Sequence, residues 1–211
     1  MTPEELAFKH PRLYHITSPN SWPLIKLLGL CSAQSLIQQL EPRKSYLLKQ
    51  RRSDSVVIHH TDLGQAVLTD QRPLSVKALT RCLDNELAPQ DWLTELNRRV
   101  FFWADRSGAE RLLKAKTNRH RARNVLIFDT YRLACDYAEY IQLSAINTGS
   151  TIRKPARRGL ATYTPMLKHS YAEWRKLRGG NDKILEVTLT CTLHKPDRYL
   201  VNTEHHPGCC H

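Results

Sequence analysis

The stretch LYHITSPNSWPLIKLLGL, residues 13–30, joins a short apolar run to a helical pattern through an abrupt turn. The β-branched and aromatic residues at its start favour a strand over Arg12–Thr17. Ser18-Pro19-Asn20 then breaks the pattern. Ser21 is suited to cap a helix that ends at Gly29. A histidine, His15, lies at the centre of the strand and calls for an explanation.

The periodicity of apolar residues predicts further helices and strands. Helices are expected at Ala33–Leu40, Ser75–Leu83, Pro89–Asn97 and Ala109–Lys116. Strands are expected at Ser55–His60, Ala66–Thr69, Val100–Trp103, Asn124–Thr130, within YIQLSAINTGST and, as the last long strand, at Lys183–Leu193. Strand pairs mixed with helices predict an α+β fold rather than a doubly wound sheet. We expect one domain over residues 1–204 and a flexible tail at 205–211.

The composition is that of an ordinary globular protein, with 41% hydrophobic and 25% charged residues. No run approaches the roughly 18 apolar residues of a membrane span. The first residues lack a basic region followed by an apolar one, so no secretory signal is expected. The six cysteines form no C-x-x-C pair, and no zinc pattern is complete. A cytoplasmic protein with no membrane partner and no metal is therefore expected.

The net charge of +12 bears on the partner rather than on the fold. Basic residues cluster at 43–52, 114–123, 153–158 and 175–178. Clusters of this kind suit a polyanion, and binding through them should weaken steeply with salt. The alternative is a solvated basic surface without a partner.

Several enzyme classes lack sequence support, because we find no P-loop, G-x-G-x-x-G after a strand, G-x-S-x-G or H-E-x-x-H motif. Three features remain. They are His15 on the first strand, the strand Phe101-Phe102-Trp103 before a polar turn, and Glu186 on the polar face of a late strand. Considered alone, His15 could also be a histidine of the core, and Glu186 could also be a solvent-exposed carboxylate on a strand.

In this order, the blocks LYHIT, LLGL, VFFWADRSGAERLL and ILEVTL resemble the ADP-ribosyltransferase superfamily of the histidine–aromatic–glutamate kind. The DarT-type nucleic-acid ADP-ribosyltransferase toxins are the most similar members. The resemblance implies an ADP-ribosyltransferase-like fold, with central mixed or antiparallel strands in a split sheet and flanking helices. The chain as a whole also resembles an uncharacterised bacterial domain-of-unknown-function family, through LYHIT…SWPLI…GL, TDQRPLS, LNRRVFFW, INTGST and ARRG.

The superfamily resemblance implies NAD as co-substrate and assigns roles to residues. Glu186 would drive transfer, because a carboxylate stabilises the oxocarbenium-like charge on the ribose. His15, donating to a hydroxyl, and Thr17 would hold the NAD. Phe102 or Trp103 would stack on nicotinamide, and strand alternation lets only one of them point inward. Arginine-modifying members generally carry Glu or Gln two residues before the glutamate, so Ile184 counts against an arginine acceptor.

Other candidates follow from the same comparison. Asn147 and Ser150 in INTGST would present amides and hydroxyls to a pyrophosphate, unless the segment is a plain tight turn. Arg51 and Arg52, and Arg157 and Arg158 in ARRG, are the candidates for binding nucleic acid. Tyr163, Tyr171 and Trp174 lie among basic residues, as a base-stacking surface requires, unless they pack in the core.

The sequence therefore predicts an NAD-dependent ADP-ribosyltransferase that modifies single-stranded DNA or RNA. A toxin or phage-defence role would follow, with a macrodomain hydrolase as the natural antitoxin. One alternative is an RNA 2′-phosphotransferase-like enzyme, which shares the fold and uses NAD but depends on basic residues rather than on Glu186. The other is a non-catalytic basic module that binds nucleic acid on the same fold.

Overall fold

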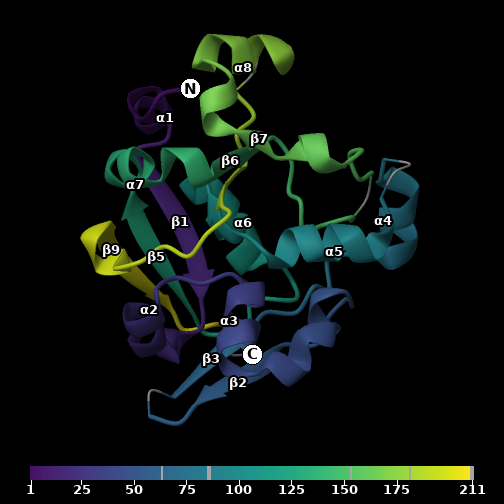
Figure 1. The fold of residues 1–211 in the computed structure, drawn as a ribbon, viewed down its shortest axis with the longest axis vertical. Helices are drawn as coiled ribbons and strands as arrows, with labels where there is room; N and C mark the ends of the chain where they lie inside the picture. Colours follow the sequence, from purple (N-terminus) through teal and green to yellow (C-terminus); the bar gives the residue numbers. More distant parts are fainter. Residues whose placement is uncertain (63, 85–86, 153, 181, 210–211) are drawn as a thin grey trace.

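The structure, a computed structural model, describes residues 1–62, 64–84, 87–152, 154–180 and 182–209 (Figure 1). The described helices are α1 Pro3–Lys9, α2 Trp22–Leu28, α3 Ala33–Leu40, α4 Val76–Cys82, α5 Pro89–Asn97, α6 Arg106–Lys114, α7 Thr130–Tyr137 and α8 Tyr171–Leu177. The strands are β1 Arg12–Thr17, β2 Val56–His60, β3 Gly64–Leu68, β4 Val100–Trp103, β5 Arg123–Asp129, β6 Ile141–Ser144, β7 Thr164–Pro165, β8 Glu186–Leu189 and β9 Leu200–His206. Short 3₁₀ helices lie at η1 Pro19–Ser21, η2 Pro42–Leu48, η3 Ala138–Tyr140, η4 Leu160–Thr162, η5 Met166–Lys168 and η6 Pro196–Arg198.

Seven strands form the main sheet in the order β7-β6-β8-β4-β1-β5-β9, with antiparallel neighbours throughout. Strands β2 and β3 form a separate antiparallel hairpin, which lies with α3 at the end of the molecule opposite α8 (Figure 1). The predicted α+β class is confirmed. Because β8 and β4 occupy the middle of the sheet, residues from the end and the centre of the chain lie side by side.

The sheet opens between β1 and β4. Strand β1 pairs with β5 along its whole length, but its register with β4 is the pair Tyr14–Trp103. A continued antiparallel ladder would bring His15 opposite Phe102 and then Ile16 opposite Phe101. Instead, the Phe101 carbonyl lies 2.8 Å from Nδ1 of His15, so a side chain takes the place of the next main-chain contact. The histidine at the centre of the first strand thus lies where the two halves of the sheet separate.

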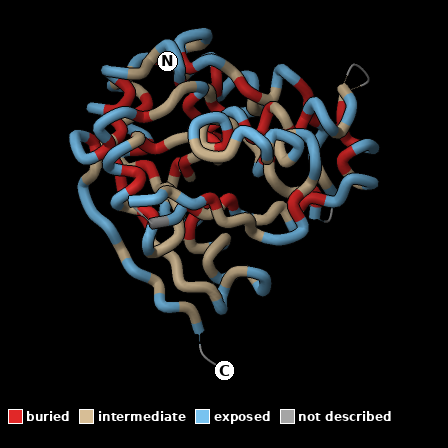
Figure 2. Tube along the Cα trace, turned by 60° about the horizontal axis from the view of Figure 1, so that its bottom comes forward, coloured by how far each residue is buried: buried red, intermediate tan, exposed pale blue. Residues whose placement is uncertain are grey.

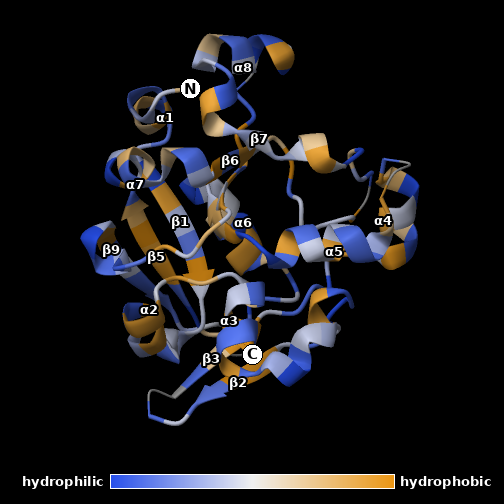
Figure 3. Cartoon of the chain, viewed as in Figure 1, coloured by the Kyte–Doolittle hydropathy of each residue, from blue (hydrophilic) through white to orange (hydrophobic). Residues whose placement is uncertain are grey.

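Three apolar clusters support this arrangement, and Figure 2 shows the buried segments running through the middle of the molecule. The largest packs against the sheet and includes Leu13, Phe102, Phe128 and Trp174. Apolar residues line β5 and the end of β1 in Figure 3. A second cluster joins α4 and α5 through Leu79 and Trp92. The third lies between α2, α3 and the β2–β3 hairpin.

Several predicted elements are confirmed at their predicted bounds, namely β1, α3, α5 and β4. Gly29 follows α2 with φ +88°, as the predicted helix end requires. The helix predicted from Ala109 begins earlier, at Arg106, because the Asp105 side chain caps it by accepting from the Gly108 amide at 2.9 Å.

The prediction of a last long strand at Lys183–Leu193 was wrong in two respects. It covers Glu186–Leu189 only, because its neighbours β4 and β6 are equally short, and it is not the last. Strand β9 follows and pairs with β5 as far as His206, so residues 205 and 206 belong to the sheet rather than to a tail. Residues 210 and 211 of the expected tail lie outside the described residues. None of the described helices has the length and apolar character to cross a membrane.

We predict that Gly108→Ala destabilises the protein by about 1–3 kcal/mol, despite the higher helix propensity of alanine. A Cβ at Gly108 would lie 2.6 Å from Cε3 of Trp103, so the indole or α6 must shift. Gly149→Ala is the matched control, because its Cβ would meet only Asn147 Oδ1, at 3.9 Å. Urea unfolding of both variants measures the difference, and equal stability would contradict the close packing of Trp103 on α6.

Candidate functional site

Glu186 begins β8 and is buried, with 5% of its surface exposed. It lies opposite Trp103 of β4 and Ser144 of β6. Opposed residues of antiparallel strands project from the same face of the sheet, so Glu186 and Trp103 share one face. Phe102 projects from the other face into the main core, where its ring meets Phe128 edge to face. Of the two predicted stacking residues, Trp103 is therefore the one on the side of the carboxylate.

The Glu186 carboxylate is held by one residue of the turn after β6. The amide of Thr148 donates to Oε1 at 3.1 Å and to Oε2 at 3.3 Å, and its hydroxyl donates to Oε2 at 2.7 Å. Burial raises the pKa of Glu186 to about 7, because the Thr148 hydrogen bonds and the nearby Arg158 oppose desolvation only in part. Glu186 therefore changes charge near neutral pH.

Buried groups hold the turn at residues 147–151 in place. Arg158, only 2% exposed, donates to the carbonyls of Thr148 at 3.1 Å and Ser150 at 3.0 Å. The indole of Trp92 donates to the same Thr148 carbonyl at 3.3 Å. The Thr151 hydroxyl accepts from the amide of Ser75 at 2.7 Å. The position of the carboxylate thus depends on a chain of contacts reaching α4 and α5.

His15 has a defined tautomer. A carbonyl oxygen only accepts hydrogen bonds, so Nδ1 carries the proton that it donates to Phe101. Desolvation lowers the pKa of His15, which keeps the ring neutral. Nε2 is then a hydrogen-bond acceptor. The expectation that His15 donates to a ligand hydroxyl is reversed by this geometry, in which Nε2 would accept from one.

One cavity of about 370 Å³ brings these residues together. Glu186 and Trp103 border it from one face of the sheet. His15 and Phe102, whose ring centroids lie 5.9 Å apart, border it from the other face, and Thr17 borders it as well. Asn147, Thr148 and Ser150 border it as well. The cavity continues past Leu24 and Leu36 to Ala66 and Leu68 of the hairpin, and a further wall is made by residues 69–71 and 73. The sequence candidates for catalysis and for NAD binding thus line a single space.

The predicted pyrophosphate turn has a different use in this structure. The Thr148 amide is engaged by Glu186, and the Thr151 amide donates to the carbonyl of Pro73 at 2.9 Å. The Ser150 hydroxyl accepts from the Ile152 amide at 3.4 Å. Asn147 is exposed at the cavity. The turn holds the carboxylate, and its engaged amides are not directed at a ligand.

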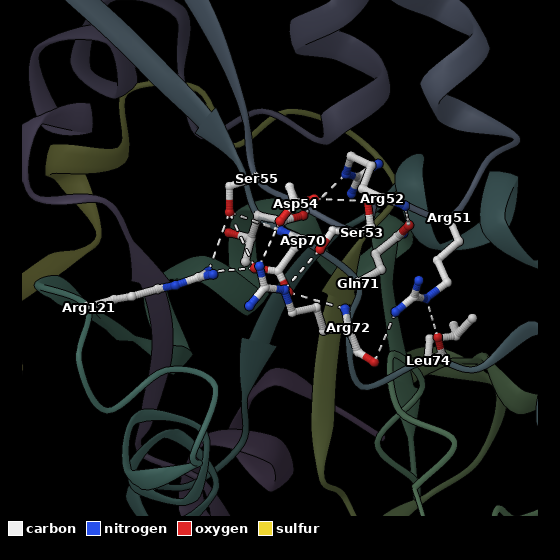
Figure 4. A network of polar contacts seen from close by, with 11 residues as sticks. Arg51, Arg52, Ser53, Asp54, Ser55, Asp70, Gln71, Arg72, Leu74 and Arg121 are labelled. Carbon is white, nitrogen blue, oxygen red and sulfur yellow. Dashed lines mark hydrogen bonds and ion pairs between the residues drawn. The ribbon is translucent and has the colours of Figure 1, made fainter.

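The arginines proposed for nucleic acid are placed differently from one another. Arg51 donates to the carbonyls of Leu74 and Arg72, and Arg52 is buried and borders the cavity (Figure 4). Arg157 is exposed and lies 3.3 Å from Asp84. Arg158 does not reach the surface, so its predicted role in gripping a phosphate is not supported by its position. Its guanidinium holds the 147–151 turn.

The proposed base-stacking aromatics are largely in the core. Trp174 is 1% exposed, and Tyr163 stacks on Trp92 at 5.6 Å. The guanidinium of Arg99 covers Tyr163 at 3.8 Å. Tyr171 is half-buried and donates to Asp182 at 2.8 Å. The alternative of core packing is therefore the better description of Trp174 and Tyr163.

Sequence reasoning missed Thr148, although it selected the turn that contains it. The missing step was the burial of Glu186, because a buried carboxylate needs donors and a polar turn beside its strand can supply them. It also missed Asn97 and Thr69, which line the cavity beside Arg52. Nothing in their sequence neighbourhood distinguishes them from ordinary helix and loop residues.

We predict that Arg158→Met destabilises the protein by about 2 kcal/mol or more, because the carbonyls of Thr148 and Ser150 lose a buried donor. Arg157→Met, at the adjacent exposed position, should change stability by less than about 1 kcal/mol. Urea unfolding compares the two. Equal effects would contradict the assignment of Arg158 to the turn.

We predict that Glu186→Gln removes a pH dependence of stability. The folded-state pKa, about 7, lies above the ordinary 4.5, so the folded protein binds more protons than the unfolded chain between these values. Stability from this group is present below pH 4.5 and is lost as the pH rises through 7. The variant should therefore gain about 3 kcal/mol relative to wild type between pH 4.5 and 8.

Urea unfolding at several pH values measures this gain. The exposed Glu139, changed to Gln, is the control and should show no such trend. A Glu186→Gln variant that keeps the wild-type pH dependence would show that Glu186 titrates in its ordinary range.

Residues 11–200 match the model of a family of unknown function (DUF7002), and the chain belongs to this family. The resemblance to an uncharacterised domain family is thereby confirmed. A search of curated proteins finds no match to the chain.

Proposed function

We propose that this member of a family of unknown function is an NAD-dependent ADP-ribosyltransferase that modifies nucleic acid. The observation that carries the proposal is the single cavity bordered by Glu186, His15, Thr17 and Trp103. These are a buried carboxylate, a neutral imidazole, a hydroxyl and a half-buried indole. Each suits a different part of a nicotinamide riboside unit.

The carboxylate supplies the chemical step. When the bond between nicotinamide and ribose breaks, nicotinamide leaves with the electron pair and positive charge develops on the ribose carbon and ring oxygen. Ionised Glu186, buried and held by Thr148, is a fixed negative charge of the kind that stabilises this state. The acceptor then forms its bond to the same carbon and loses its proton.

The other residues orient the substrate. Nε2 of His15 would accept a hydrogen bond from a ribose hydroxyl, and Thr17 would offer its own hydroxyl beside it. Trp103 would present an aromatic face on the carboxylate side of the sheet. These roles need the neutral form of His15, which its lowered pKa favours.

Nucleic acid is the acceptor best suited to the charge of the chain. The net charge of +12 attracts nucleic acid regardless of its nucleotide sequence. Ile184 argues against an arginine side chain as acceptor. Single-stranded DNA or RNA would expose the bases to modification. A transferase of this kind would act as a toxin or phage-defence effector, countered by a macrodomain hydrolase.

We predict that the purified protein transfers label from radiolabelled NAD to one pool among single-stranded DNA, RNA and total protein. Glu186→Gln should lower the rate by about 100-fold or more. Because the carboxylate must be ionised, wild-type activity should rise about tenfold per pH unit below the pKa of about 7 and then level.

Thr148→Ser keeps a hydroxyl donor for Glu186 and should retain more activity than Thr148→Val. Transfer that survives Glu186→Gln would favour the 2′-phosphotransferase-like alternative, which depends on basic residues. Salt-sensitive binding of nucleic acid with no NAD consumed would favour the non-catalytic module. Relief of growth inhibition by Glu186→Gln tests the toxin role.

A further inference from the structure

Arg52 is a buried cation without a carboxylate of its own. It is 8% exposed and borders the cavity. Its Nε donates to the carbonyl of Thr69 at 3.2 Å, and Nη1 donates to Asn97 Oδ1 at 2.9 Å and to the carbonyl of Leu47 at 3.4 Å. Within the described part of the chain, Nη2 has no acceptor and no carboxylate forms an ion pair with Arg52.

The surrounding charges do not neutralise it. The charge of Asp70 acts on Arg52, but Asp70 forms ion pairs with Arg121 at 2.5 Å and with Arg72 at 3.9 Å. In the network of Figure 4, Asp54 pairs with Arg72, and Asp70 pairs with Arg72 and Arg121. Both aspartates are thus engaged by other arginines, and neither forms an ion pair with Arg52.

Burial of the Arg52 guanidinium costs free energy. Desolvation lowers the pKa of Arg52 to about 10, which still leaves it charged at neutral pH. A buried charge is normally paired, because leaving water without a counter-charge costs free energy. Arg99, which also borders the cavity, has such a partner in Glu95 at 2.7 Å.

We propose that Arg52, with Asn97 beside it, forms an anion subsite that binds a phosphoryl group of the cavity ligand. Nη2 is the free donor, while the hydrogen bonds from Nε and Nη1 fix the guanidinium plane in advance. Neutral acceptors hold the side chain, so its charge remains available to the ligand.

The proposal rests in one part on the proposed function, which makes the phosphoryl group the pyrophosphate of NAD. It moves Arg52 from the nucleic-acid surface into the cavity. It also replaces the 147–151 turn as the pyrophosphate site, because the Thr148 and Thr151 amides are engaged within the protein.

The experiment is calorimetric titration of the full chain with inorganic pyrophosphate, ADP-ribose and adenosine at constant ionic strength. Wild type should bind pyrophosphate and ADP-ribose. Arg52→Gln should weaken both by about tenfold or more, the loss of a charge-assisted hydrogen bond. Arg52→Lys keeps the positive charge but loses the planar guanidinium with its paired N–H donors, so its affinities should lie between those of wild type and Arg52→Gln. Any affinity for adenosine, which has no phosphate, should not change.

Arg51→Gln is the matched control, since Arg51 is adjacent and donates to the carbonyls of Leu74 and Arg72 rather than bordering the cavity. It should leave the affinities unchanged. Thermal unfolding identifies variants that fail to fold. If an Arg52 variant fails to fold, the test is instead the thermal stability of the wild-type protein. Pyrophosphate should then raise its unfolding temperature more than chloride does at equal ionic strength.

The proposal is overturned if wild type binds neither anion, or if Arg52→Gln binds them as wild type does. Failure of the proposed function would look different. Pyrophosphate binding that depends on Arg52, in a protein that consumes no NAD, would retain the subsite and reject the transferase. NAD consumption that is insensitive to Arg52→Gln would do the reverse.

Discussion

The hydrogen bond between Nδ1 of His15 and the Phe101 carbonyl determines the shape of the site. It lies where β1 and β4 would otherwise continue their ladder beyond the pair Tyr14–Trp103. Because a side chain satisfies the carbonyl there, the strands can separate without leaving a buried acceptor unpaired. The cavity lies at this opening, and the same contact fixes the tautomer of the ring that borders it. One residue thus opens the sheet and presents an acceptor to the space it creates.

The cavity also concentrates groups that a core would avoid. Glu186 is buried with neutral donors from Thr148, and Arg52 is buried with neutral acceptors. Each ionised group is withdrawn from water without a direct counter-ion, and burial shifts the pKa of both toward neutrality. Arg99, at the same cavity, is by contrast paired with Glu95 at 2.7 Å. Unpaired buried charge of both signs around one space is more readily explained by a dipolar ligand than by folding stability.

The sequence was informative where local pattern decides structure. Apolar runs and turn residues predicted β1, β4, α3 and α5, and the order of His15, Trp103 and Glu186 predicted residues that share one cavity. What failed depended on tertiary contacts. Charge alone could not separate Arg157, exposed, from Arg158, buried beneath the 147–151 turn. Strand β9 carries polar residues on an edge, so its pairing with β5 left little periodic signal. The ADP-ribosyltransferase relationship itself remains a proposal.

The position of β8 has a consequence for how the protein forms during synthesis. In the strand order β7-β6-β8-β4-β1-β5-β9, strand β8 joins the pair β7-β6 to the strands β4-β1-β5-β9. The two parts of the sheet therefore meet only when β8 pairs with both β6 and β4. Strand β8 follows β1, β4, β5 and β6 in the chain, so a nascent polypeptide that has already exposed these four strands still lacks the strand that joins β6 to β4. Such long-range pairing is slow to form. Glu186 is part of β8, and a ribosome-bound chain therefore has no assembled site until β8 has been synthesised.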